Sequence, residues 1–417
     1  MAEPTPSAPA EGPATETRSP FASARFTRWW CASLVAGTGV GIQSVTVPLF
    51  IRDRVEDDVR ALAIAGALVA QTLPGALVSL LGGALADRVE RRRILVRTYA
   101  IAALVSTAYV GLSHFDVRRF WLVYPLAALV GCAGAFTNPA RQSLLPQILS
   151  RAQLQNGVIF GTMGFMATLQ FLGPTVAGLV VDLRGLTAAF GLEVVLLAAG
   201  ATLFSRIRTD PPAPTGRSIL RDLADGLRYA AKVPSLVGLL GLATLPGIFF
   251  IGPFAVTVAL VVPDVHHASD KWVGILWGCF GAGVFLGSLL LTLRPLARRG
   301  LAVCLSNLVG GCVLVLYGSS SVLWLSAGTL VVWGLCASVF INYVVALLQE
   351  HTEPAMMGRV MSMYSLVFFV AMPIGYAQAG LVTSLFGPQT TLVASGLAAA
   401  ALGLGCVLFL RPVRALE

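Results

Sequence analysis

Residues 300–349 contain no Asp, Glu, Lys or Arg, and a second run of this kind covers residues 360–410. A helix that crosses a bilayer needs only about 20 apolar residues. Each run is therefore long enough for two crossings. Turn-forming residues interrupt the first run with YGSSS at 317–321 and the second with SLFGPQT at 384–390, and these segments predict where the chain reverses.

Apolar stretches of similar length recur through the rest of the chain. They lie at 29–51, 61–86, 94–113, 120–140, 152–181, 186–205, 233–263 and 272–293. Transmembrane β-strands would instead alternate over segments of roughly 10 residues. With 56% hydrophobic residues the chain also exceeds the composition of ordinary soluble domains. The sequence predicts an all-α membrane protein with twelve transmembrane helices.

The polar segments between these stretches suggest five parts. The first is rich in Pro, Ala, Thr and Glu, which favours disorder, and the third contains SILRDLADGLRYAAKV at 218–233, whose apolar positions recur at helical spacing. The expected parts are a disordered cytoplasmic tail at 1–24, a six-helix bundle at 25–205, a cytoplasmic linker with an amphipathic helix at 206–234, a second six-helix bundle at 235–410, and a cytoplasmic tail at 411–417.

The basic residues are divided unequally between the two sides of the membrane. If the N-terminus is cytoplasmic, the inner segments hold 22 of the 29 Lys and Arg residues and the outer segments hold 7. Basic residues are retained on the cytoplasmic side of membrane proteins. We therefore expect a plasma-membrane protein with both termini in the cytoplasm, and the net charge of +9 then gives no reason to expect nucleic acid binding.

An internal repeat relates the two halves of the chain. LGPTVAGLVVDLRG at 172–185 and IGYAQAGLVTSLFG at 374–387 share residues from Gly173/Gly375 through Gly185/Gly387. The two copies run in the same direction, six spans apart, which indicates pseudo-symmetric bundles related by an axis along the membrane normal. Such bundles enclose a cavity on the axis, so the pattern predicts a transporter that works by alternating access.

Residues 82–93, GGALADRVERRR, bring a dense group of charges directly after the uncharged run 61–86. This segment resembles the signature between the second and third helices of the major facilitator superfamily, with Glu90 in place of its second Gly. The resemblance implies a gating latch at the cytoplasmic face. The matching residues are Gly83, Asp87, Arg88, Arg91 and Arg92.

Arg141 is the candidate partner of Asp87 in this latch, because Arg forms well-directed pairs with carboxylates. The alternative is that Arg141 reaches out to the membrane interface along its apolar stem. The three consecutive arginines at 91–93 likewise have a simpler explanation, since cytoplasmic basic residues anchor a turn without any further function.

Three further segments resemble transporters that export small molecules. Gly173, Pro174 and Gly178 resemble an antiporter signature of the superfamily, although small residues also serve ordinary close packing of helices. TNPARQSLLPQILSRAQLQNGV at 137–158 and MGRVMSMYSLVFFVAMPIG at 357–375 resemble the drug:proton antiporter branch that contains enterobactin exporters and macrolide efflux proteins. The resemblance implies export of a small molecule in exchange for protons.

Glu193 is the acidic residue well inside an expected span. A carboxylate there costs on the order of 3 kcal/mol unless it faces the cavity or is protonated. We therefore consider Glu193 a candidate for proton coupling. The alternative is a side chain that a neighbour neutralises at the periphery of the bundle.

Polar and aromatic residues in the spans that line the cavity of this superfamily are the substrate candidates. Each could instead make a hydrogen bond or packing contact between helices. Together they describe an apolar, aromatic pocket with few fixed charges, which suits a bulky amphiphilic drug, antibiotic or siderophore better than a small anion. They are Gln43, Ser44, Asn138, Gln170, Phe249, Phe250, Phe254, Trp333, Asn342, Tyr343 and Gln378.

The sequence lacks the usual motifs of an enzyme. It contains no HExxH, GxSxG or P-loop pattern, and its seven Cys residues are scattered without metal-ligand spacing. We expect no catalysis, no cofactor and no metal, and a monomer whose partners are a small molecule, protons and the bilayer. Two alternatives stay open: a lysophospholipid or metabolite transporter of the same fold, and a membrane sensor that no longer transports.

Overall fold

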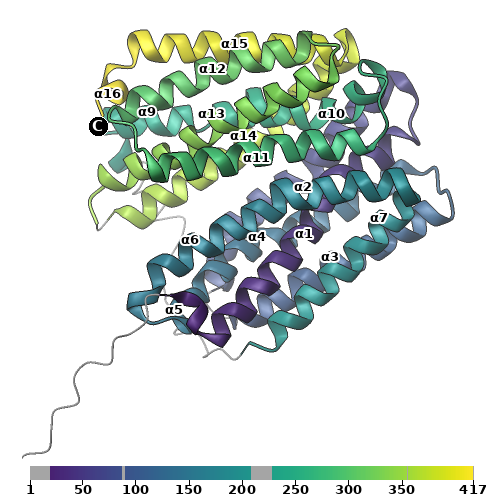
Figure 1. Ribbon diagram of the computed structural model, residues 1–417, viewed down its shortest axis with the longest axis horizontal. Helices are drawn as coiled ribbons and strands as arrows, with labels where there is room; N and C mark the ends of the chain where they lie inside the picture. The colour runs from purple at the N-terminus through teal and green to yellow at the C-terminus, as the bar shows by residue number, and fades with distance from the viewer. Residues whose placement is uncertain (1–18, 87–89, 208–227, 355, 417) are drawn as a thin grey trace, which may run out of the picture.

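The computed structural model describes residues 19–86, 90–207, 228–354 and 356–416 (Figure 1), and all regular structure in these ranges is helical. The first half of the chain forms long antiparallel helices joined by short turns. These are η1 (Pro20–Ala22), α1 (Ala24–Arg52), α2 (Asp57–Ala86), α3 (Arg91–His114), η2 (Phe120–Leu122), α4 (Val123–Ser143), α5 (Leu145–Ile148), α6 (Arg151–Ala167), η3 (Thr168–Leu172) and α7 (Gly173–Ser205).

The second half repeats this arrangement. Its helices are α9 (Pro234–Leu242), η4 (Pro246–Ile251), α10 (Gly252–Asp264), α11 (Lys271–Leu293), α12 (Arg299–Ser319), α13 (Leu323–Glu350), α14 (Met357–Phe386), α15 (Pro388–Phe409) and α16 (Arg411–Arg414). The wide turns η3 and η4 each precede a Gly-Pro pair, at Gly173 and Gly252. A proline removes a backbone donor and crowds the preceding turn, and a π-turn accommodates it without breaking the span.

The number of crossings agrees with the twelve expected from the sequence. The described residues contain 11 apolar helical segments of membrane length, of which Ala152–Ser205 has 54 residues. At 1.5 Å per residue such a segment would reach about 80 Å, far more than the roughly 30 Å of a bilayer core. It bends at Gly185 and therefore contains two crossings, which confirms the all-α membrane fold.

The internal repeat is also visible in the backbone. Gly185 has φ 81° and ψ 173°, and its counterpart Gly387 has φ 84° and ψ 166°. Residues other than glycine rarely adopt this conformation. A side chain at either position would meet no atom within 4 Å, so the backbone, and not packing, requires glycine there. Each glycine joins the fifth and sixth crossings of its half.

The two halves lie side by side and meet along several pairs of helices. Figure 1 shows the first half in purple to blue-green and the second in green to yellow, with contacts between α2 and α14, α7 and α11, and α1 and α10. Small residues bring these helices together. A Cβ on Gly274 would overlap the carbonyl oxygen of Pro174, and one on Gly380 would overlap the Ala65 side chain.

These contacts lie toward one face of the molecule. We call the face that carries the start of α1 and the short helix α16 the terminal face, and the opposite face the far face. Gly274 and Ala65 lie near the starts of α11 and α2, and Gly178 and Gly380 lie near the ends of the fifth and eleventh crossings, all toward the far face. In Figure 1 the two bundles converge away from α16.

Short helices lie inside the tails that the sequence predicts at the two ends of the chain. Residues 1–18 lie outside the described part, but residues 20–24 are ordered, because Phe21 packs edge-on against Phe26, Trp30 and Phe160 at 5.2 to 5.4 Å between ring centres. At the other end, α16 falls inside the expected tail at 411–417. Val413 is fully buried there against Gly238 and Gly300, which leave room for it.

Only the end of the expected amphipathic helix at 218–233 can be compared with the structure, because residues 208–227 lie outside the described part. Residues 228–230 are helical. The Tyr229 hydroxyl accepts a hydrogen bond of 3.2 Å from the backbone N–H of Glu353. This bond joins the end of the linker to the turn between α13 and α14.

Candidate functional site

An ion pair joins the two halves at the far face. Arg52, the last residue of α1, lies 2.7 Å and 3.0 Å from the two carboxylate oxygens of Asp270, which precedes α11. The same guanidinium also contacts the Asp53 carboxylate at 2.7 Å. The Arg52 side chain is only 12% exposed, so water screens this pair less than an ordinary surface pair. The sequence does not indicate this pair, because the two residues are 218 positions apart.

A second and weaker link lies beside it. Lys271 of α11 is 3.7 Å from Asp182 in α7, and both side chains are partly exposed. Pairs of this kind contribute less than about 1 kcal/mol. The neighbouring contact of Gly178 with Gly274 holds the same two helices at close range and is the stronger constraint.

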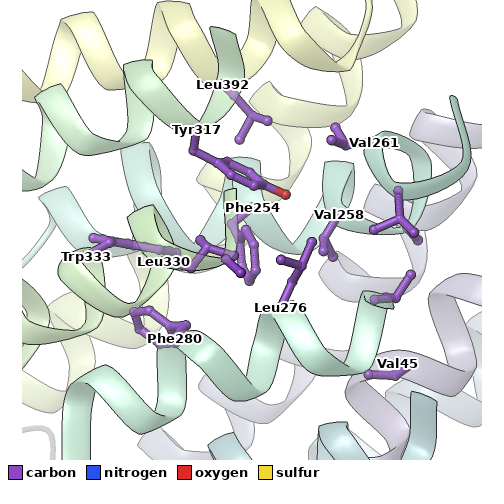
Figure 2. Packing of buried hydrophobic residues seen from close by; sticks show 14 of the residues in the cluster. Val45, Phe254, Val258, Val261, Leu276, Phe280, Tyr317, Leu330, Trp333 and Leu392 are labelled. Atoms are coloured by element: carbon purple, nitrogen blue, oxygen red, sulfur yellow. The ribbon is translucent and has the colours of Figure 1, made fainter. Parts of the chain in front are cut away.

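Apolar side chains from both halves fill the space next to these links. Ile42, Val45 and Leu49 of α1 pack with Val258 of α10 and Leu276 of α11, all fully buried. Figure 2 shows Val45 facing the helix that carries Leu276. We call this group the far-face seal. It closes the region between the halves on this side.

Five aromatic rings extend the far-face seal into the core of the second half, and Figure 2 labels Phe254, Phe280, Tyr317 and Trp333 among them. Phe254 lies 4.7 Å from Trp277 and 5.3 Å from Trp333, measured between ring centres. Phe280 lies 4.4 Å from Trp333, and Tyr317 lies 6.0 Å from Phe254. The rings come from α10, α11, α12 and α13, so they hold four helices of one bundle together.

Three of the substrate candidates, Phe250, Phe254 and Trp333, lie in or beside this cluster. Phe254 is fully buried, and Phe250 and Trp333 are each 4% exposed, so in this conformation the three rings contact one another instead of an open cavity. Burial of large rings is a strong driving force for packing. Phe249, by contrast, is half-buried and remains a candidate.

Two glutamines form a polar contact between α1 and α2 inside the first half. Gln71 of α2 donates a hydrogen bond of 3.0 Å to the side-chain oxygen of Gln43 in α1. Gln71 was not among the sequence candidates. Ser44 donates to the carbonyl of Gly41 at 2.7 Å, and Gln170 and Gln378 are half-buried on η3 and α14.

The candidates toward the terminal face differ in how accessible they are. Asn138 of α4 and Asn342 of α13 are exposed, and Asn342 donates to the Ser288 hydroxyl at 3.1 Å. Tyr343 is buried, and its hydroxyl accepts a hydrogen bond of 2.8 Å from the N–H of Leu296. Tyr343 therefore fixes the turn between α11 and α12 and is not available to a substrate here.

The expected latch is described only in part. Asp87 and Arg88 lie outside the described residues, and Gly83 lies in the last turns of α2. Arg91 donates to the carbonyl of Ser143 at 2.8 Å, and Arg92 pairs with Glu90 at 2.9 Å. The first contact ties the start of α3 to the end of α4, and the second stays within the start of α3.

Arg141 is buried in the first half, with its side chain 1% exposed. Its guanidinium donates to Asn138 at 3.1 Å and to the carbonyl of Gly161 at 3.3 Å, and it lies 4.0 Å from the centre of the Phe165 ring. The alternative that Arg141 reaches the membrane interface is therefore wrong. Its pairing with Asp87 stays a prediction.

Glu193 lies in α7 and is fully buried against α3. One carboxyl oxygen is 2.6 Å from the Ser106 hydroxyl, and the other has no hydrogen-bond partner in the described part of the chain. The ion pairs of the described residues give it no cationic partner. The polar neighbour of Glu193 is thus a hydroxyl inside the bundle, and no cation of the described residues neutralises the carboxyl group.

The glycines of the antiporter-like segment lie at two helix crossings. A Cβ on Gly173 would come too close to Gly41 of α1, and one on Gly178 would come too close to Gly274 of α11. Pro174 occupies the first turn of α7, directly after the wide turn η3. The segment therefore provides close packing both within the first half and between the halves.

Comparison with known proteins agrees with this architecture. Residues 15–416 match a family model described as transmembrane secretion effector. Macrolide efflux protein A of Streptococcus pyogenes is 22% identical over 383 residues, which cover 89% of this chain and 92% of that protein. An enterobactin exporter of Escherichia coli is 25% identical over 400 residues, which cover 93% and 92%.

Solved transporter structures share the fold. The nucleoside transporter NupG has a TM-score of 0.71 at 14% identity, with 93% of this chain and 99% of that chain covered. A bacterial homologue of the human lysosomal transporter Spinster, in an inward-facing and unoccupied conformation, has a TM-score of 0.64 at 14% identity, with 96% of each chain covered.

Proposed function

The chain belongs to the transmembrane secretion effector family of the major facilitator superfamily, and we propose that it exports a bulky amphiphilic small molecule by proton-coupled alternating access. The matched relatives that carry the names of exporters act on a macrolide and on enterobactin. The candidate polar residues here are amides and hydroxyls, which suit a substrate with little net charge.

The link between Arg52 and Asp270 is the observation that supports this mechanism most directly. It joins the two halves at the far face, above the far-face seal. Asn138 and Asn342, which lie toward the terminal face, are exposed. In an alternating-access cycle the far-face contacts would break when the terminal face closes, because rigid bundles rock against each other around a central site.

We assign the terminal face to the cytoplasm. The unequal distribution of Lys and Arg residues supports this orientation. The described conformation is then open toward the cytoplasm, where an exporter would take up its substrate. The latch expected between Asp87 and Arg141 would act when this face closes.

Glu193 is our candidate for the proton-binding residue. The Ser106 hydroxyl lies 2.9 Å from the carbonyl of Ala102 as well as 2.6 Å from Glu193. Its single hydrogen can satisfy only one of these acceptors fully. If it goes to Ala102, the short contact with Glu193 requires a proton on the carboxyl group.

The test is accumulation of three substrate classes in cells with and without the protein. Fluorescent cationic dyes, macrolides and catecholate siderophores would each be measured, with and without a proton uncoupler. The proposal expects lower accumulation of at least one class in expressing cells, and loss of the difference when the uncoupler is added. Equal accumulation of all classes would overturn efflux, higher accumulation would indicate import, and a difference that survives the uncoupler would overturn proton coupling.

A further inference from the structure

Arginines surround the end of α7 at the terminal face. α7 ends between the starts of α1 and α3, since it packs against both helices along their length. The side chains come from all three helices, and all except Arg92 are exposed. The arginine cluster consists of Arg25, Arg28, Arg92, Arg93, Arg97 and Arg206.

Two cavities lie within this cluster, one on each side of the end of α7. The first has a volume of about 420 Å³ and is lined by Arg25, Arg28, Arg206 and Ile207. Ile207 is almost fully buried and gives this cavity an apolar wall beneath three cationic side chains.

The second cavity has a volume of about 350 Å³. Val96 and Ser205 line it together with Arg92, Arg93 and Arg97. Val96 is partly buried among the apolar residues of the first bundle. Each cavity therefore combines several guanidinium groups with an apolar wall.

The charges of the first cavity are not neutralised within the described part of the chain. Glu90 pairs with Arg92 at 2.9 Å and with Arg93 at 2.8 Å. No carboxylate of the described residues lies within ion-pairing distance of Arg25, Arg28 or Arg206. Several unpaired arginines around one cavity repel each other, and a bound anion relieves that repulsion.

The depth of the cluster along the helices corresponds to the headgroup layer of a bilayer. Arg25 lies in the first turn of α1 and Arg206 follows the last residue of α7. Trp30, one turn into α1, donates its ring N–H to the carbonyl of Phe160 at 3.1 Å. Tryptophans of membrane proteins concentrate at this level. A ligand in these cavities would have its charge at the interface and its apolar part beside the helices.

We propose that the arginine cluster binds the phosphate headgroup of an anionic phospholipid, with Arg25, Arg28 and Arg206 as the principal ligands. The planar guanidinium group matches the geometry of phosphate oxygens and donates two parallel hydrogen bonds. Ile207, which lines the same cavity, contacts the glycerol and the first acyl carbons. This site lies outside the region between the halves and is independent of the transported substrate.

The retention of basic residues on the cytoplasmic side would also place arginines at this face. It would not, however, gather them around two cavities with apolar walls. A free phosphate ion would use the same guanidinium groups and would gain nothing from Ile207 or Val96. The two sources of phosphate can therefore be separated by experiment.

The test is native mass spectrometry of the purified full chain in detergent, titrated with phosphatidylglycerol, cardiolipin or phosphatidylcholine. The proposal expects both anionic lipids to bind more tightly than phosphatidylcholine. The triple variant Arg25→Gln, Arg28→Gln, Arg206→Gln should weaken phosphatidylglycerol binding about a hundredfold, since each of the three arginines near an anionic lipid contributes a factor of about five. Equal binding by the wild type and this variant would overturn the proposal.

A matched control removes the same charge from the far face. Arg118, Arg119 and Arg184 are exposed there, and their replacement by Gln should leave lipid binding unchanged. If it weakens binding equally, net charge and not the cluster is responsible, and the assignment fails. If the first triple variant does not fold, Arg206→Gln alone is compared with Arg184→Gln by the same criterion.

The last measurement adds inorganic phosphate at millimolar concentration to the protein with phosphatidylglycerol bound. The proposal expects it to leave most of the phosphatidylglycerol bound, because the apolar contacts belong to the lipid alone. Complete displacement by inorganic phosphate would overturn the lipid assignment and indicate a site for the free anion. Tight binding of phosphatidylcholine would also overturn it, since that headgroup carries no net charge.

Discussion

Arg52 and Asp270 form a bidentate ion pair between the end of α1 and the start of α11. The two guanidinium nitrogens of Arg52 lie 2.7 Å and 3.0 Å from the two carboxylate oxygens of Asp270. One residue belongs to each half of the molecule. The pair can therefore form only while the far face is closed. Its interaction energy stabilises the closed state of this face relative to the open state.

Removing this pair should shift that equilibrium. Asp270→Asn should raise the labelling rate of a cysteine placed at Val45, in the far-face seal, by about fivefold to tenfold, the effect of losing about 1 kcal/mol of a partly buried ion pair. The measurement is the rate of maleimide labelling after replacement of the seven native cysteines.

The neighbouring pair of Arg54 and Asp116 is the matched control. It spans 3.4 Å but lies entirely within the first half. Asp116→Asn should leave the labelling rate unchanged. If both substitutions act equally, the pair between the halves has no special role in closing the far face.

The two equivalent glycines at the hairpins should be intolerant of any side chain. Gly185→Ala and Gly387→Ala should each destabilise the protein by about 1 to 3 kcal/mol, because alanine rarely adopts their backbone conformation. Thermal unfolding in detergent measures this. Gly191→Ala is the control, since Gly191 is helical and its side chain would also meet nothing within 4 Å; it should be neutral or stabilising. Tolerance at Gly185 would contradict the strain argument.

Phe254 should matter for stability and not for substrate affinity. Phe254→Ala removes a fully buried ring that packs against four others and should cost about 3 to 5 kcal/mol. Phe254→Leu keeps most of the volume and should fold, with an unchanged substrate concentration for half-maximal transport. A large rise in that concentration for Phe254→Leu would place the ring at the substrate site after all.

Glu193→Gln separates coupling from folding. The amide can still form a hydrogen bond with Ser106, so the variant should unfold at nearly the same temperature as the wild type, but it cannot release a proton. Uncoupler-sensitive efflux should be lost. Glu350→Gln, which breaks the surface pair with Arg299, should retain it. Unchanged proton-driven efflux in Glu193→Gln would remove Glu193 from the coupling mechanism.

The pairing of Asp87 with Arg141 can be tested by exchanging the charges. Asp87→Arg and Arg141→Asp should each abolish transport, and the double variant should recover part of it. Transport by purified protein in vesicles, normalised to folded protein, measures the recovery. No recovery would argue that Arg141 is held by Asn138, Gly161 and Phe165 without a latch partner.

The fold could be predicted from the sequence because bilayer dimensions constrain it strongly. The uncharged runs specify the crossings. Gly185 and Gly387 recur at the same place in both halves of the sequence and have the same backbone conformation in the structure. Helix-breaking residues and charges at the ends of spans mark, within short stretches of sequence, where each crossing begins and ends.

The inward-facing residues were harder to predict. A transmembrane helix that is apolar on every side has no polar face to mark the cavity. Phe249 and Phe254 therefore could not be distinguished in sequence, although one is half-buried and the other is completely enclosed. Gln71 and the pair of Arg52 with Asp270 depend on which helices become neighbours, and one sequence does not specify that.

The central claim is that the two faces open alternately, and distances between spin labels on opposite halves test it most directly. One pair would replace Glu56 and Ser269 at the far face, and the other Gln142 and Gln349 at the terminal face, all exposed. When pH or substrate is changed, the account predicts that the far-face distance lengthens while the terminal-face distance shortens. Two distances that stay constant under every condition, or that lengthen together, would contradict it.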